Sequence, residues 1–189
     1  MKSNVKPTSG EIDRALIDVA AFVFARHGFA QGTVQAIADA SGYSKAAVLK
    51  RFGSKERIQD AVVAHAEETA TTLAGVAAEV PAGAGRDAAL VEALVGMIAE
   101  RPGMGALIVG AFCLTREPEV MDRLSGAQHT LMAAFGPDTW SDEERHVRVV
   151  AAIGAVTATM MANRVERWTD RTDVIVAAGL GALGHRAGL

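Results

Sequence analysis

Apolar side chains recur at helical spacing along most of the chain. Between residues 11 and 27, for example, Leu16, Val19, Val23 and Phe24 follow one another at intervals of one, three and four, which puts them on one helix face. No stretch sustains the alternation typical of a strand, and no Asn-Gly or Asp-Gly pair marks a hairpin. Apolar periodicity and stop signals divide the chain into about nine helices, so the pattern predicts an all-α fold.

The stretch 33–58 predicts two short helices separated by a glycine turn, followed by the start of a third helix. Thr33 suits an N-cap, Ser41-Gly42 breaks the first helix, Gly53 ends the second, and Ser54 caps the next. Two such helices joined by a short turn form the helix-turn-helix plan, in which the second helix enters a DNA major groove.

The helices around this stretch have their own start and stop signals. Thr8 and Glu11 have capping-box spacing before a helix that Gly28 should end, and Ser141 and Glu144 have the same spacing before a later helix. We expect the remaining helices, in chain order, at about 55–79, 86–100, 103–116, 118–135, 144–167 and 172–184, with a linker at 81–85.

Composition favours a soluble, cytoplasmic protein. Half of the residues are apolar, which is enough for a substantial core. Cys113 is the single cysteine, so no intrachain disulfide can form and a reducing compartment is the natural one. The N-terminal residues lack the apolar core of a signal peptide, and no apolar run reaches the roughly 18 residues that a membrane span needs.

Charge is distributed unevenly along the chain. Residues 1–57 hold nine Lys and Arg against five Asp and Glu, whereas residues 58–189 hold ten against seventeen. Every lysine lies at or before position 55. A basic end on an acidic chain fits a nucleic-acid-binding module joined to a part that avoids nucleic acid, and the helix-turn-helix pattern falls in the basic part. We therefore expect a DNA-binding domain at 1–55 and a larger domain at 56–189.

Residues 14–58 resemble the DNA-binding domain of the TetR family of transcriptional regulators. The resemblance rests on a spaced pattern: Ala20 and Phe24 before His27-Gly28-Phe29, then Thr33-Val34, Ile37-Ala38, Ser41-Gly42, Ser44-Lys45, Phe52 and Ser54-Lys55-Glu56. It implies an all-helical homodimer with a three-helix N-terminal head and a larger helical ligand-binding and dimerisation domain. It also implies a regulator, most often a repressor, that binds a palindromic operator in double-stranded DNA and is released by a small molecule.

The resemblance also implies which residues contact DNA. Residues 44–51 would form the recognition helix, beginning with Ser44, and Lys45, Ala46 and Ala47 would face the bases, since Lys can donate to guanine and Ala methyls can contact thymine methyls. Phosphate contacts would come from hydroxyl, amide and cationic side chains, namely Thr33, Gln35, Lys50, Arg51 and Lys55.

Some of these assignments have plain structural alternatives. Lys50, Arg51 and Lys55 could form a solvated basic face, and Ala46 and Ala47 could be simple helix formers. Tyr43 could pack in the turn or turn its hydroxyl toward phosphate. Many family members carry an aromatic residue at the positions of Leu49 and Arg51. Leu49 cannot hydrogen-bond a phosphate, so Lys50 and Arg51 would take over that contact, and operator preference does not carry over from relatives.

Small residues recur every three or four positions in the last two predicted helices. Glycine inside a helix costs roughly 1 kcal/mol relative to alanine, so close helix approach is the expected reason. Either these are core helices of a monomer or they form a dimer interface, and two-fold symmetry favours the interface because helix-turn-helix proteins usually read two half-sites. The residues are Ala151, Gly154, Ala155, Ala158, Ala162, Ala178, Gly181 and Ala182.

The larger domain is expected to hold an apolar ligand cavity between helices. Methionine adapts to irregular ligands, and few charges fall in the predicted helix centres, which favours a hydrophobic or neutral effector. Each candidate could equally be ordinary core. The candidates are Met97, Met104, Phe112, Cys113, Met121, Met132, Phe135, Met160, Met161 and Asn163.

The sequence gives no support for catalysis, a cofactor or a metal. It contains no nucleophile elbow, P-loop, dinucleotide fingerprint or HExxH motif, and its histidines lack metal-ligand spacing. We therefore expect no enzyme activity. Two alternatives to ligand-controlled repression remain: a regulator that responds to oxidation of Cys113, and a regulator without a small-molecule ligand. Sequence identifies neither the effector, the operator nor the regulated genes.

Overall fold

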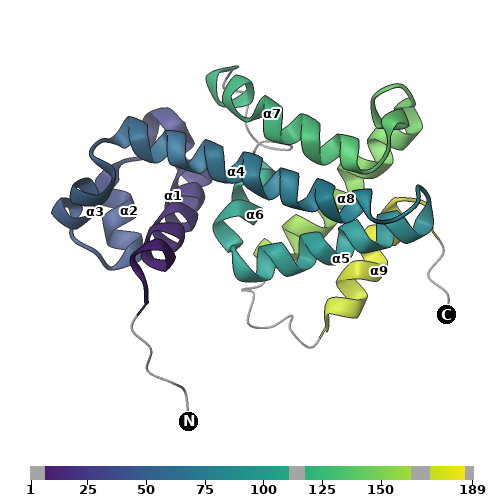
Figure 1. Cartoon of the computed structure of the whole chain (residues 1–189), viewed down its shortest axis with the longest axis horizontal. Helices are drawn as coiled ribbons and strands as arrows, with labels where there is room; N and C mark the ends of the chain where they lie inside the picture. The colour runs from purple at the N-terminus through teal and green to yellow at the C-terminus, as the bar shows by residue number, and fades with distance from the viewer. Residues whose placement is uncertain (1–6, 111–117, 163–170, 186–189) are drawn as a thin grey trace, which may run out of the picture.

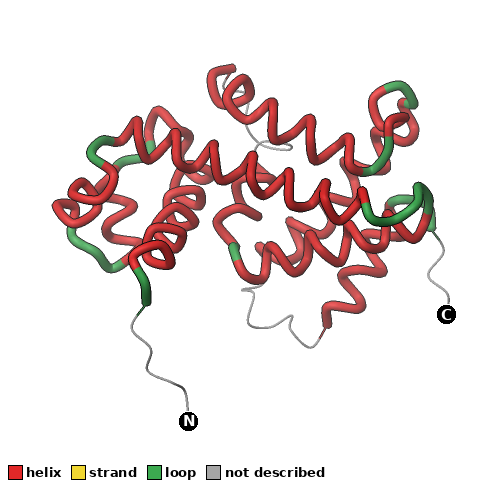
Figure 2. Tube along the Cα trace, viewed as in Figure 1, coloured by secondary structure: helices red, strands yellow, loops and turns green. Residues whose placement is uncertain are grey.

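The computed structural model describes residues 7–110, 118–162 and 171–185. Within these ranges the backbone forms nine α-helices, one short 3-10 helix and no strand, which confirms the predicted all-α fold (Figures 1 and 2). None of these helices is both long and apolar enough to cross a membrane. The helices are α1 (Ser9–Gln31), α2 (Val34–Ser41), α3 (Lys45–Phe52), α4 (Lys55–Ala78), α5 (Ala84–Glu100), α6 (Pro102–Val109), α7 (Pro118–Ala134), η2 (Pro137–Trp140), α8 (Glu143–Ala162) and α9 (Thr172–Ala182).

The first helix begins as the sequence predicts but ends later. Thr8 and Glu11 form the reciprocal capping box, with the Thr8 side chain accepting from the Glu11 N–H. Gly28, expected to end the helix, has φ 77° and kinks the chain, and helical backbone then continues to Gln31. Gly32 follows, where a Cβ would lie 2.5 Å from the Phe24 ring, so only glycine lets the chain turn closely over this aromatic side chain.

Hydroxyl caps and glycine turns build the next two helices as expected. The Thr33 side chain accepts from the Ala36 N–H and the Ser44 side chain from the Ala47 N–H, each at 3.1 Å. Between them Gly42 adopts the left-handed conformation, with φ 75°. The helix-turn-helix at 33–52 is therefore set by local chemistry, and Gly53 and Ser54 separate it from α4.

Helices α1 to α3 pack with the first part of α4 into a head at one end of the molecule (Figure 1). Its core is not confined to residues 1–55, because Met104 and Leu107 of α6 and Leu124 of α7 complete it. The other buried members are Leu16, Ala20, Ala21, Val23, Phe24, Phe29, Val34, Ile37, Ala38, Val48, Ile58 and Val62.

The long helix α4 runs from the head into a second, larger bundle, where α7 lies along it and α5, α6 and α8 complete the packing (Figure 1). The apolar core of this bundle is built from α4, α5, α7, α8 and α9. Met97 of α5 packs against both cores, so they are contiguous.

A buried carboxylate ties the far end of the bundle together. Asp87 of α5 accepts two hydrogen bonds from Arg145 of α8, at 2.7 and 2.9 Å, and lies 2.7 Å from His185 Nε2 beyond α9. Arg145 also donates to the Phe135 carbonyl. Both carboxylate oxygens of Asp87 have a hydrogen-bonding partner, so its negative charge is compensated although the side chain is buried.

Three expected helix boundaries need correction or lie outside the described residues. The capping box at Ser141 and Glu144 is wrong: Asp142 caps α8, accepting from the Arg145 N–H at 3.1 Å, and the Ser141 hydroxyl instead contacts the Asp138 carbonyl. Aspartate and serine are both good N-caps, so adjacent candidates compete and spacing alone does not choose. The expected extensions of α6 to 116 and of α8 to 167 run beyond the described ranges.

Candidate functional site

The residues expected to contact DNA lie on α2, on α3, in the turns before these helices and at the first residue of α4, at the end of the head farthest from the larger bundle (Figure 1). Most are exposed, and only Ala47, Leu49 and Lys55 are half-buried. At the start of α3, Lys45 and Ala46 project from a helix whose opposite side is anchored by the fully buried Val48. A short helix held by its apolar side thus presents cationic and small residues to solvent.

The four cationic candidates differ in their surroundings. No hydrogen bond or ion pair joins Lys45 or Lys50 to any described residue, and both side chains are exposed. Arg51 instead pairs with Asp13 and donates to the Ser9 carbonyl, which ties α3 to the start of α1. Lys55 donates to the Ala30 carbonyl at 2.6 Å. Lys45 and Lys50 therefore have their donors available, whereas Arg51 and Lys55 hold the head together.

Three other candidates have local structural roles. Thr33 and Ser44 use their hydroxyls as caps, and Gln35 donates to Asp39 at 2.7 Å along α2. Leu49 packs against the head core, which gives an apolar residue at this position a structural reason. Tyr43, in the turn before α3, is 41% exposed, so the residue is not packed into the head core.

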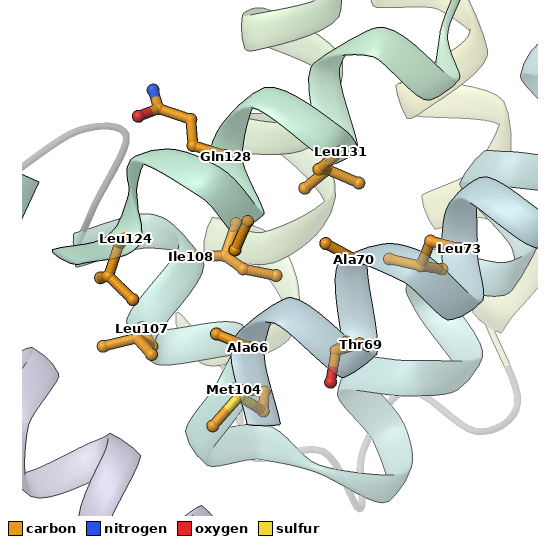
Figure 3. Close-up of a pocket in the computed structure, with 11 residues that line it drawn as sticks. Ala66, Thr69, Ala70, Leu73, Met104, Leu107, Ile108, Leu124, Gln128 and Leu131 are labelled. Atoms are coloured by element: carbon orange, nitrogen blue, oxygen red, sulfur yellow. The ribbon is translucent and has the colours of Figure 1, made fainter. Parts of the chain in front are cut away.

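A small apolar cavity lies between α4, α6 and α7 (Figure 3). Its volume is about 40 Å³, room for roughly three water molecules. The Thr69 hydroxyl donates to the His65 carbonyl within α4, and the Gln128 side chain points away from the cavity (Figure 3). The lining is Ala66, Thr69, Ala70, Leu73, Met104, Leu107, Ile108, Leu124, Ala127, Gln128 and Leu131.

Of the expected ligand residues whose side chains the structure describes, only Met104 lines this cavity. Met132, Phe135 and Met160 lie in the core of the larger bundle, Met97 packs between the two cores, and Met161 is half-buried. Phe112, Cys113 and Asn163 lie outside the described residues, as does the side chain of Met121. Sequence reasoning looked for sulfur and aromatic rings and missed the aliphatic lining. Ala66, Ala70 and Leu73 on one face of α4, at spacings of four and three, were the available signal.

Two polar contacts join the walls of the cavity to the head. The Asp18 carboxylate of α1 accepts from the backbone N–H groups of Gly103 and Met104 at the start of α6, both at 3.0 Å. Burial raises the pKa of Asp18, although these two N–H groups act in the opposite direction. On α7, Arg123 pairs with Asp60 at 2.6 Å and lies over the Phe29 ring. Sequence reasoning missed both contacts.

The small residues of α8 and α9 line a face that the described chain leaves uncovered. Ala151, Ala158, Ala162, Ala178 and Gly181 are exposed, and Gly154, Ala155 and Ala182 are half-buried. Two large apolar side chains accompany them, Val147 at 60% and Val174 at 56% exposure. A Cβ at Gly154 or Gly181 would meet no atom within 4 Å, so packing inside the chain does not require glycine there.

Residues 16–62 match the sequence family described as bacterial regulatory proteins, tetR family. The fold is similar to that of a TetR-like transcriptional regulator from Rhodococcus sp. RHA1, with a TM-score of 0.59 at 15% identity over 96% of this chain and 100% of that one. The regulator FadR from Bacillus subtilis, solved in complex with stearoyl-CoA, has a TM-score of 0.57 at 16% identity over 90% and 95%. PfmR, a TetR family transcriptional regulator from Thermus thermophilus, has a TM-score of 0.52 at 22% identity over 97% and 100%. No curated protein sequence matches the chain significantly.

Proposed function

We propose that this chain, whose residues 16–62 match the tetR family of bacterial regulatory proteins, is a DNA-binding transcriptional regulator that acts as a dimeric repressor of a palindromic operator. A small hydrophobic or neutral effector, bound in the larger bundle, releases the DNA. The observation that carries the proposal is α3, a capped helix with its apolar side buried and Lys45, Ala46 and Lys50 exposed.

The polar chemistry of the head supports a division between base and phosphate contacts. Lys45 at the start of α3 can donate to guanine O6 and N7, while Ala46 and Ala47 can contact thymine methyls. Lys50, Thr33, Gln35 and the Tyr43 hydroxyl would contact phosphates and fix the register of the head. Arg51 and Lys55 would reach phosphate by exchanging their present partners, Asp13 and the Ala30 carbonyl.

The uncovered face of α8 and α9 supports the dimer. Val147 and Val174 stand beside small residues there, and glycine at 154 and 181 is unexplained by contacts within the chain. A second copy would cover this face isologously and would relate the two heads by a two-fold axis, as a palindrome requires. Obligate interfaces are more apolar than ordinary surface, and this face has that character.

The cavity between α4, α6 and α7 supports an apolar effector. Its lining is aliphatic apart from Thr69 and Gln128, and Met104 can change rotamer to admit a guest. At about 40 Å³ it must widen to hold a drug-sized molecule, so binding would move the helices that enclose it. The Bacillus subtilis FadR structure, which contains stearoyl-CoA, supports the idea that this fold accommodates an apolar guest.

Selection from a pool of random DNA duplexes, followed by gel mobility shifts at low salt, tests DNA binding. We expect enrichment of a palindrome that binds two copies of the chain. The double variant Lys45→Ala, Lys50→Ala should keep the fold and lose the selected site. Failure of a folded dimer to enrich any sequence would overturn the proposal.

Effector release is tested on the selected operator with decanol, a neutral apolar probe, and with stearoyl-CoA, the ligand in the Bacillus subtilis FadR structure. We expect an apolar probe to raise the melting temperature of the protein and to weaken operator binding. Release by peroxide in the wild type but not in Cys113→Ser would instead establish the oxidation-sensing alternative.

A further inference from the structure

The start of α6 is held by a carboxylate from the head. Asp18, in the middle of α1, accepts from two successive N–H groups that α6 itself leaves without partners, those of Gly103 and Met104. A negative charge at a helix N-terminus is also favoured by the helix dipole. The contact therefore combines two charge-assisted hydrogen bonds with a favourable field, and it joins residues 85 and 86 positions apart in sequence.

Close packing fixes the geometry of this contact. A Cβ on Gly103 would lie 1.8 Å from the Asp18 carbonyl oxygen and 2.8 Å from its carboxylate, so the two helices touch through backbone. Helices α1 and α6 are therefore in direct backbone contact at this point. Helix α6 can shift here only if α1 shifts with it or the contact breaks.

Met104 of α6 connects the Asp18 carboxylate to the cavity. Met104 donates its N–H to Asp18 while its side chain, 1% exposed, lines the cavity between α4, α6 and α7 (Figure 3). One residue thus faces the ligand cavity with its side chain and the head with its backbone. Leu107, one turn further along α6, lines the cavity and belongs to the head core.

Arg101, His65 and Glu68 form a hydrogen-bonded chain between the start of α6 and α4. Arg101 precedes α6 and places Nη1 3.0 Å from His65 Nε2, and Glu68 lies 3.1 Å from the other ring nitrogen of His65. A guanidinium only donates, so His65 accepts from Arg101 and donates to Glu68. The Arg101 guanidinium also attracts the Asp18 carboxylate electrostatically from the start of α6.

We propose that Asp18 is the positioning residue through which the cavity controls the orientation of the DNA-binding head. This rests on the proposed function, which it deepens by naming the route of regulation. A guest in the cavity pushes α6 away from α4 and α7, and Met104 moves with the wall. Because Asp18 joins the start of α6 to α1, helix α1 then moves with α6, and α2 and α3 move with α1. The route acts in parallel with α4, which joins the head to the bundle covalently.

A double-mutant cycle tests this without knowledge of the natural effector. Ala127→Leu places an isobutyl group in the cavity from α7, leaves α1 and α6 unmutated, and serves as a built-in guest. Asp18→Asn keeps the size of the side chain but removes its charge and one of its two acceptors. Operator affinity is measured by fluorescence anisotropy for the wild type, each single variant and the double variant, on the operator recovered by selection.

We expect Ala127→Leu to weaken operator binding at least tenfold in the wild-type background and no more than threefold with Asp18→Asn. Amide exchange at Gly103 and Met104 should be slow in the wild type and faster in Asp18→Asn. Asp87→Asn is the matched control, because Asp87 is another buried carboxylate but its partners are Arg145 and His185. In that background the tenfold effect should persist.

The outcomes separate this inference from the proposed function. An equal loss with and without Asp18→Asn overturns the role of Asp18 while leaving operator binding established. No loss from Ala127→Leu in the wild-type background also overturns it, since the cavity would then not act on the head. Absence of any operator for the wild type overturns the proposed function itself. If Asp18→Asn does not fold, Asp18→Glu, which displaces the carboxylate by one methylene, takes its place in the cycle.

Discussion

The guanidinium of Arg123 lies over the ring of Phe29, 5.4 Å from the ring centre. Arg123 belongs to α7 of the larger bundle, whereas Phe29 closes α1 in the head and stacks on Phe24 at 4.9 Å. The same guanidinium pairs with Asp60 of α4. This contact and the contact of Asp18 with α6 hold the head on both sides of α4.

Removing the Arg123 side chain should destabilise the protein through the loss of its contact with the ring. A cation over an aromatic face is worth about 0.5–1 kcal/mol at a partly exposed site, whereas an exposed ion pair contributes between about 0 and 1 kcal/mol. Since the Asp60 side chain is 71% exposed, we expect Arg123→Ala to lower the free energy of unfolding by about 1 kcal/mol and Asp60→Asn by clearly less. Urea denaturation measures both, and equal losses would assign the contact to the ion pair.

The stability contributed by Asp18 should depend on pH in a defined direction. Burial raises the folded-state pKa of Asp18 above its usual value of 3.8, so its contribution is fully present below that value and is lost as pH rises through the folded-state pKa. Relative to Asp18→Asn, which does not titrate, the wild type should therefore lose free energy of unfolding as pH rises from about 4 toward neutrality. Denaturation of both proteins across this range checks the sign, and a relative gain would mean that the two N–H donors outweigh burial.

Lys45 and Lys50 should affect DNA binding in different ways. Lys45 starts α3, so Lys45→Ala should change which base is preferred at one operator position, at a cost of about 1–3 kcal/mol on the preferred sequence. Lys50→Ala should weaken binding to all sequences similarly and lower the slope of log affinity against log salt by about 1. Binding to a panel of single-base operator variants at several salt concentrations separates the two. Loss of affinity on every sequence alike would reject base contact by Lys45.

A charge on the uncovered face of α8 should dissociate the dimer. Ala158 is exposed in the centre of this face, so Ala158→Arg would bury an unpaired cation in the interface. We expect a monomer in sedimentation velocity, with helical content unchanged and operator affinity strongly reduced. Ala99→Arg, on an exposed position of α5, is the matched control and should remain dimeric.

Two glycines of the last helices should respond oppositely to alanine. A Cβ on Gly179 would lie 2.9 Å from Val156 and 3.0 Å from Val91, both branched at Cβ and unable to swing aside, so Gly179→Ala should lower the free energy of unfolding by about 1–3 kcal/mol. A Cβ on Gly154 meets no atom within 4 Å, so Gly154→Ala should raise the free energy of unfolding of the single chain by roughly 1 kcal/mol and weaken self-association. Thermal melting and sedimentation equilibrium distinguish the two effects.

Local chemistry explains how much of the fold could be predicted. The caps at Thr8, Thr33, Ser44 and Ser54 each act on an N–H three residues away, and Gly42 supplies the left-handed turn. Such signals lie within one turn of the chain, so the sequence displays them directly. The prediction failed at Ser141, where Asp142 was the stronger competitor.

The site was less predictable because its decisive contacts are distant in sequence. Asp13 and Arg51 are 38 residues apart, and nothing in either position indicates that the recognition helix is tied to the start of α1. The cavity likewise depends on how closely α4, α6 and α7 approach. It is lined mostly by alanine and leucine, which are also the commonest residues of an ordinary core, so composition does not mark it.

Helices α6 and α7 of the larger bundle supply part of the head core. The head alone is therefore not a suitable module for engineered regulators. A fragment ending at residue 55, or a fusion that joins residues 1–55 to a foreign sensor, would leave the head core without Met104, Leu107 and Leu124. A transplantable unit must therefore include α6 and the middle of α7. A bundle that replaces the larger one must therefore match the apolar surface of the head. The position at which the chain is cut matters less than the apolar side chains that the cut exposes.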